Sequence, residues 1–240
     1  MTDIRSDASV ASHEPFRFAP RPDPTGHQPG VTDMPHADQV RKHAPWNRGL
    51  RSGGSSLAWL LPLGDRPELR KLANQYQYSL RDLPGFDPVP LEWMHILLQE
   101  VQDREQAPAG RAEELLRVAR ERLSSFAPLS LSFHGGLVLS ESLALPAEPQ
   151  ATLTDLRGRL REVTSEVLGS EPPEAPDEID QHVSLAYATA DGPAVFAKAT
   201  LDATVVDPVT LSVPAISLVE LNREQACSEW SRIGEVELSG

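Results

Sequence analysis

Two histidines, His95 and His182, stand far apart in the chain, each in a short apolar run that is typical of a strand. The runs are "EWMHILLQEV" at 92–101 and "DQHVSLAYAT" at 180–189. Because the unperturbed pKa of histidine is about 6.5, one neutral ring and one protonated ring can act as general base and general acid near neutral pH. Two imidazoles facing a common cleft would suit cleavage of a phosphodiester or a cyclic phosphate, a scheme that requires no metal.

The neighbours of the two histidines differ. Side chains two residues apart in a strand share a face, so Ser184 accompanies His182 and Leu97 accompanies His95. The Ser184 hydroxyl suits binding of a non-bridging phosphate oxygen, whereas Leu97 supplies no hydroxyl. Tyr187 is a candidate ligand contact, but an ideal strand would point it away from the face of His182, and packing is its commoner role.

The segments between these runs predict an α/β chain in which strands and helices alternate in two comparable halves. Helical spacing of apolar residues marks 66–80, 110–126 and 153–169, with Gly169 as a C-terminal cap, and a shorter helix is expected within 192–205. Strands are expected within 56–63, 92–101, 129–147, 181–189 and 209–222. The segment 223–238 predicts a helix containing Trp230 and then a final strand.

Composition limits the possible functions. The chain of 240 residues is 40% apolar and carries a net charge of −13, which argues against a broad surface for nucleic-acid backbone. Cys227 is the single cysteine, so neither an intrachain disulfide nor a cysteine-based zinc site is expected. No apolar run approaches the roughly 18 to 20 residues that span a bilayer, and the first residues do not resemble a signal peptide, so we expect a cytoplasmic location and no membrane partner.

The composition divides the chain near residue 54. Residues 1–54 are rich in Pro, Gly, Asp and Ser and predict a disordered or loosely attached tail, while residues 55–240 predict the folded domain. Four of the seven histidines lie in this tail: His13, His27, His36 and His43. They follow no metal-ligand spacing, so we expect solvated side chains there and no metal or other cofactor in the protein.

Over roughly residues 57–239 the chain resembles the 2H phosphoesterases, and among them the bacterial 2′-5′ RNA ligase-like proteins. The family signature is a histidine, any residue, Thr or Ser, and an apolar residue. It falls on His182-Val183-Ser184-Leu185 and, without its hydroxyl, on His95-Ile96-Leu97-Leu98. The segments "LPGFDPVPLEWMH", "HVSLAYATADGPA" and "ISLVELNRE" add to the resemblance.

The resemblance implies two pseudosymmetric lobes, each a small, mainly antiparallel sheet with helices packed outside, flanking a central cleft. It implies acid/base roles for His95 and His182 and phosphate binding by Ser184. The implied substrates are 2′,3′-cyclic phosphates, 2′-5′ linkages or RNA ends, processed without a metal cofactor. Which histidine is the acid, whether the reaction is hydrolysis or ligation, and the oligomeric state stay open.

Leu97 keeps a second hypothesis open. Loss of a hydroxyl that binds phosphate in the transition state removes about 1.5 to 3 kcal/mol, or roughly 10- to 150-fold in rate. The alternatives to an active phosphoesterase are therefore a catalytically weakened protein that binds a nucleotide or an RNA end, and an interaction scaffold in which both histidines are core residues.

Overall fold

The protein is described here by a computed structural model that covers residues 35–43, 55–103, 110–172, 181–222 and 229–240. Its helices are α1 (Pro67–Leu80), α2 (Arg111–Arg122), α3 (Gln150–Leu168) and α4 (Val195–Ala203), with a 3₁₀ turn, η1, at Leu91–Trp93. All four helices form where the sequence predicts a helix, although α3 begins three residues earlier than expected. Gly169 ends α3 in the left-handed conformation at φ 70°, as expected for a glycine cap.

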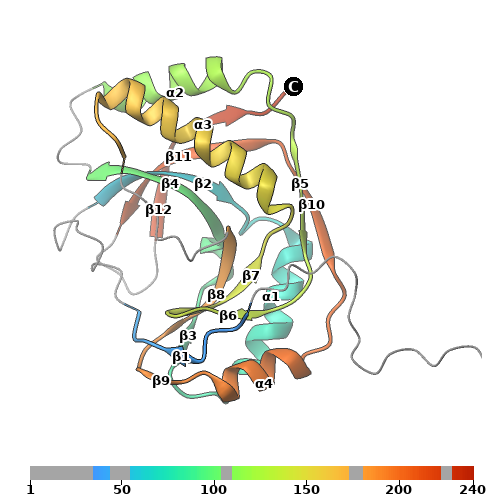
Figure 1. Ribbon diagram of the computed structural model, residues 1–240. Helices are drawn as coiled ribbons and strands as arrows, with labels where there is room; N and C mark the ends of the chain where they lie inside the picture. Colours follow the sequence, from blue (N-terminus) through green and yellow to red (C-terminus); the bar gives the residue numbers. More distant parts are fainter. Residues whose placement is uncertain (1–34, 44–54, 104–109, 173–180, 223–228) are drawn as a thin grey trace, which may run out of the picture. The chain divides into compact units, whose positions relative to one another are not determined.

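The strands form two four-stranded antiparallel sheets and two short ladders (Figure 1). The first sheet has the order β12-β11-β2-β4 and the second the order β3-β8-β7-β6; β10 pairs with β5, and β1 with β9. The bounds are β1 (Gln39–Val40), β2 (Ser55–Pro62), β3 (Phe86–Pro88), β4 (His95–Asp103), β5 (Leu129–Phe133), β6 (Leu137–Val138), β7 (Ser142–Pro146), β8 (His182–Ala188), β9 (Gly192–Pro193), β10 (Val209–Val213), β11 (Ala215–Asn222) and β12 (Glu229–Glu237). The predicted mixture of helices with small antiparallel sheets is confirmed.

The central strand of the first sheet, β2, is buried on both faces, which explains its unbroken apolar sequence. Leu57, Trp59 and Leu61 enter the main core. Ala58 and Leu60 point to the opposite face, where they form a smaller apolar cluster. Strand β2 therefore packs against apolar side chains on both of its faces.

The two sheets contain a repeated strand-helix-strand unit. In the first unit, β2 ends at Pro62 and leads to α1, and the chain returns in β4, where His95 lies opposite Pro62. In the second unit, β7 ends at Pro146 and leads to α3, and the chain returns in β8, where His182 lies opposite Pro146. Each histidine thus begins a strand at the same place in its unit, as expected for pseudosymmetric halves.

The helices of the two units are exchanged between the sheets. Helix α1 follows a strand of the first sheet but packs on β8 of the second, and α3 follows a strand of the second sheet but packs on β4 of the first (Figure 1). The side chain of Gln77 on α1 donates hydrogen bonds to the carbonyl oxygens of Val89 and Leu185, at 2.7 and 2.9 Å. One continuous core therefore joins both sheets.

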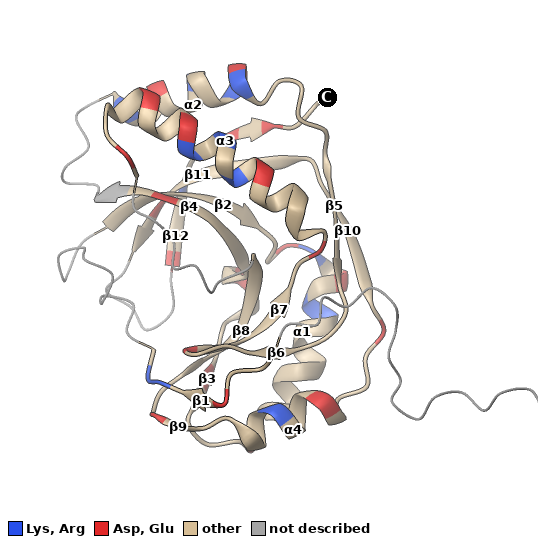
Figure 2. Ribbon diagram, in the orientation of Figure 1, with Lys and Arg blue, Asp and Glu red and all other residues tan. Residues whose placement is uncertain are grey.

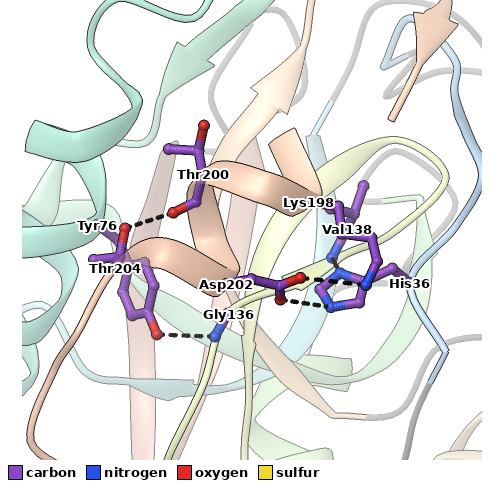
Figure 3. Close-up of polar contacts among 8 residues, drawn as sticks. All are labelled: His36, Tyr76, Gly136, Val138, Lys198, Thr200, Asp202 and Thr204. Atoms are coloured by element: carbon purple, nitrogen blue, oxygen red, sulfur yellow. Dashed lines mark hydrogen bonds and ion pairs between the residues drawn. The ribbon is translucent and has the colours of Figure 1, made fainter. Parts of the chain in front are cut away.

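Residues 35–43, which we name the N-terminal strap, belong to the fold. Val40 is 5% exposed in the main core, and the strap backbone bonds to the chain at Val138, Ser140, Ala188 and Ala194. Figure 3 shows its beginning, where the ring of His36 accepts a hydrogen bond from the Val138 amide at 3.2 Å and lies 3.5 Å from an Asp202 carboxylate oxygen. The expectation of a loosely attached tail therefore does not hold for this segment, and residues 1–34 and 44–54 lie outside the described residues.

Two local expectations were wrong. The strand expected over 92–101 begins only at His95, since Leu91–Trp93 form a 3₁₀ turn. Trp230 lies in β12 rather than in a helix, because pairing with β11 places it opposite Leu221 and against the smaller apolar cluster. Cys227 lies outside the described residues.

Positively and negatively charged side chains are mixed along α2 and α3, whereas β7 and β8 carry few charged side chains (Figure 2). Ion pairs such as Arg122 with Glu166, at 2.6 Å, join these two helices. Within the described ranges, no helix is long and apolar enough to cross a membrane.

Candidate active site

His95 is held by the turn that precedes its strand. Its Nδ1 atom lies 2.7 Å from the carbonyl oxygen of Trp93 in η1. A carbonyl oxygen only accepts hydrogen bonds, so Nδ1 carries a hydrogen and donates it. In the neutral ring, Nε2 is then the basic nitrogen, and the turn fixes both the orientation and the tautomer of the imidazole.

The surroundings of His95 favour its neutral form. Burial lowers the pKa of His95; the hydrogen bond to the Trp93 carbonyl acts in the opposite direction, and the charge of His182 lowers the pKa further. A neutral imidazole with a basic Nε2 is the state that a general base requires before the reaction.

His182 lies near His95 although 86 residues separate them in the sequence. Strands β4 and β8 contact one another, and each histidine is the first residue of its strand. The rings are near enough for a charge on His182 to lower the pKa of His95. Both side chains are half-buried, so the structure brings the two predicted imidazoles together and does not seal either of them in the core.

Ser184 and Tyr187 share the face of His182, the second because of a β-bulge. Across from β8, Ala144 pairs with Ser184 and Leu143 pairs with Ala186, so Leu185 is an extra residue with no partner in β7. The half-buried positions in β8 are accordingly His182, Ser184 and Tyr187, while the residues between them are buried. The expectation that Tyr187 points away from this face was wrong, since it assumed an ideal strand.

Leu97 has a packing role in the first sheet. It lies directly opposite Leu60 and packs against the smaller apolar cluster, which consists of Ala58, Leu60, Val219 and Leu221. Trp230 packs on the same cluster and meets Trp93 edge to face, with ring centroids 5.8 Å apart. Beside His95, β4 therefore carries an apolar side chain, whereas the face that carries His182 holds a hydroxyl and a phenol.

The strap brings a third histidine to β8, which the sequence analysis placed in the tail. The ring of His43 stacks on that of Tyr187, with centroids 4.2 Å apart and planes 12° apart. Its Nδ1 lies 3.0 Å from a carboxylate oxygen of Glu141. No sequence motif connects His43, Glu141 and Tyr187. The sign in the sequence that the strap packs on the domain is Val40, an apolar residue among polar ones.

Among the described residues, no group of three or more His, Cys, Asp or Glu side chains is arranged to hold a metal ion. The His36 ring already accepts a hydrogen bond from the Val138 amide. Burial lowers the pKa of His36, and so does the charge of Lys198, while Asp202 raises it. The neutral ring that results can keep this bond, so His36 serves to anchor the strap.

Solved structures similar to this fold include two bacterial proteins. TT0787 of Thermus thermophilus is 22% identical with a TM-score of 0.58, and the match covers 77% of this chain and 98% of that one. E. coli LigT complexed with 3′-AMP is 15% identical with a TM-score of 0.55, and the match covers 79% of this chain and all of that one. At such identities the likeness concerns the fold alone. Among curated proteins, no sequence matches the chain.

The sequence itself matches one family model, described as the 2′-5′ RNA ligase superfamily, over residues 55–225. The matched range contains both strand-helix-strand units and both histidines, and it excludes the strap. Because this range is well over half of the chain and the fold agrees with it, the chain belongs to the 2′-5′ RNA ligase superfamily of 2H phosphoesterases.

Proposed function

We propose that the protein is a 2H-type phosphoesterase that acts on a 2′,3′-cyclic phosphate, a 2′-5′ linkage or an RNA end through acid/base catalysis by His95 and His182. The observation that carries this proposal is the state of His95. Its Nδ1–H is bound to the Trp93 carbonyl, and its pKa is lowered by burial and by the nearby His182. These features prepare Nε2 to accept a proton.

For hydrolysis of a cyclic phosphate the protons balance between the two rings. His95 Nε2 removes a proton from water as the water oxygen bonds to phosphorus. The bond from phosphorus to one ribose oxygen breaks, and imidazolium His182 gives its proton to that oxygen. His95 is then protonated and His182 neutral, and exchange of one proton with solvent restores the starting state. No metal is required in this scheme.

Ser184 binds the phosphate in this proposal. It lies two residues from His182 on the same half-buried face of β8, so its hydroxyl can donate to a non-bridging oxygen. Tyr187 follows on that face and is proposed as a ligand contact. The face of β4 offers Leu97 instead, so β8 supplies the polar contacts to the phosphate.

A nucleotide substrate is supported by what is bound to a protein of the same fold. Structures of E. coli LigT contain 3′-AMP, phosphate, NADP⁺ or ATP. We infer that the present chain also recognises a phosphate joined to a nucleoside. The net charge of −13 favours a short ligand held in a pocket over a long polynucleotide held by its backbone.

The test is turnover of adenosine 2′,3′-cyclic phosphate by the wild-type chain and by His182→Ala. We expect the variant to lose about 10²- to 10⁴-fold in kcat while its circular dichroism and melting temperature stay unchanged, because the half-buried ring is replaced without disturbing β8. Arg117→Ala is the control, since Arg117 is an exposed residue of α2 that lies outside the proposed site. Equal turnover by wild type and His182→Ala would refute the proposal.

The second candidate function is binding of a nucleotide or RNA end with little or no turnover. The observation that favours it is the integration of Leu97 into the apolar cluster opposite Leu60, because the leucine side chain offers no donor to a phosphate oxygen. Calorimetry with 3′-AMP together with the turnover assay distinguishes the two functions. Tight binding without turnover supports the binding protein, and turnover supports the enzyme.

A further inference from the structure

The N-terminal strap lies outside the family match and yet reaches the strand of the second histidine. The match begins at residue 55, whereas the strap comprises residues 35–43. The strap pairs with β9 through Gln39 and Val40, and the His43 amide donates to the carbonyl oxygen of Ala188 at 2.7 Å. This last bond fixes His43 beside the end of β8.

The side chain of His43 is fixed as firmly as its backbone. Glu141 accepts from its Nδ1 at 3.0 Å, and Tyr187 stacks on the plane of the ring at 4.2 Å. The imidazole retains 18% exposure and the Glu141 side chain 34%, while Tyr187 is half-buried. The strap thus presents an ordered pair of aromatic planes that solvent still reaches.

The position of this pair relative to Ser184 suits a nucleotide. The bulge at Leu185 turns Tyr187 to the face of Ser184 and His182. Tyr187 lies three positions after Ser184 along the strand, a distance of roughly 10 Å. A phosphate bound at Ser184 would place its nucleoside within reach of the stacked rings, and nucleobases stack on aromatic and imidazole planes without strong sequence preference.

We propose that His43 and Tyr187, held by Glu141, form the subsite for the nucleobase of the substrate, so that the strap supplies a residue that distinguishes a nucleotide from a bare phosphate. The inference rests on the proposed function for the placement of the phosphate. It goes beyond that function in assigning base recognition to a segment that precedes the matched family range.

The experiment measures binding of two probes, 3′-AMP and inorganic phosphate, to the full chain by titration calorimetry. We expect His43→Ala to weaken 3′-AMP binding about 5- to 30-fold, the scale of one lost base-stacking contact, and to leave phosphate binding unchanged. With adenosine 2′,3′-cyclic phosphate, KM should rise by a similar factor at constant kcat. His43→Phe, which keeps an aromatic plane, should recover most of the affinity for 3′-AMP.

Lys42→Ala is the matched control, because it removes an exposed cation from the neighbouring position and leaves the stacked rings in place. It should change neither the ratio of the two affinities nor the melting temperature. If His43→Ala weakens both probes equally, the ring serves only to position β8 and the inference fails. If neither affinity changes, it fails as well.

The two proposals can fail separately. A chain that binds 3′-AMP through His43 but does not turn over the cyclic nucleotide would overturn the proposed function and retain the subsite. A chain with turnover that depends on His182, and with 3′-AMP affinity that is indifferent to His43→Ala, would overturn the subsite and retain the function. A wild-type chain that binds neither probe would overturn both.

Discussion

The two strand-helix-strand units have the same framework but different chemistry. In each, a strand ends in a proline and the returning strand starts with a histidine opposite that proline, at Pro62 and His95 or at Pro146 and His182. Beyond the histidine the units diverge. Leu97 packs into an apolar cluster, whereas Ser184 lies on a half-buried face with Tyr187.

The repeated framework thus determines where the two imidazoles lie. The side chains around each imidazole differ between the two units. A base works best when it is neutral, and the first unit supplies burial, which lowers the pKa of His95. The second unit places a hydroxyl and a phenol on the half-buried face of β8. We infer that the first half contributes a proton acceptor, and that the second half contributes a proton donor together with most of the ligand contacts.

The assignment of His95 as the base and His182 as the acid can be tested with substrates that have different leaving groups. We expect His95→Asn and His182→Asn each to lower turnover of the cyclic nucleotide about 10²- to 10⁴-fold. With a p-nitrophenyl phosphodiester, whose leaving group needs no proton, His182→Asn should recover most of the wild-type rate and His95→Asn should not. The reverse pattern, measured from initial rates, would exchange the roles of the two histidines.

The hydroxyl that one unit has and the other lacks offers a second comparison. Ser184→Ala should lower kcat/KM roughly 10- to 150-fold through loss of a hydrogen bond to the phosphate. Leu97→Thr should raise it within the same range if the first unit can use a hydroxyl. The gain comes with a loss of about 1–2 kcal/mol in the free energy of unfolding, because Leu97 packs against Leu60 and its neighbours.

Urea unfolding of both variants measures that cost separately from catalysis. Ser184→Ala removes no packing from the apolar cluster and is the control for stability. An unchanged rate in a stable Leu97→Thr chain would mean that the ligand is held by β8 alone, which would favour the binding function.

The smallest expected effect is the position of the acid limb in the pH profile. His95 must be neutral to act as base, and burial and His182 lower its pKa from the usual value of 6.5. On the acid side, kcat/KM should therefore decrease, by up to tenfold per pH unit, only below pH 6.5, whereas the need for a protonated His182 determines the alkaline side of the profile. The decrease of kcat/KM at low pH should be absent from the residual activity of His95→Asn. A decrease on the acid side that begins above pH 6.5 would contradict the assignment of His95 as the base.

Much of the fold and both histidines could be predicted from the sequence, because periodicity is a local signal. The apolar stripe of 153–169 and the cap at Gly169 depend on neighbouring residues alone, and α3 formed as expected. The pairing of His95 with His182 followed from two similar strands in comparable halves, and the structure brings the two rings together.

What the sequence did not predict depends on partners that are distant in the chain. The bulge at Leu185 appears only in the pairing of β8 with β7, and the carbonyl of Leu185 accepts a hydrogen bond from Gln77 of α1. The strap is attached mainly by backbone hydrogen bonds, which any sequence can form. Its polar composition therefore gave no sign that it would pack on the folded domain. Trp230 joined a strand because β11 lies beside it.

The exchange of α1 and α3 between the sheets has a mechanical consequence. Each sheet is covered by a helix that emerges from the other, so a hinge movement that parted the sheets would pull both helices out of their packing at once. Such interiors resist deformation. We therefore expect the distance between the two imidazoles to be set by the packing of the core and to change little when a ligand binds.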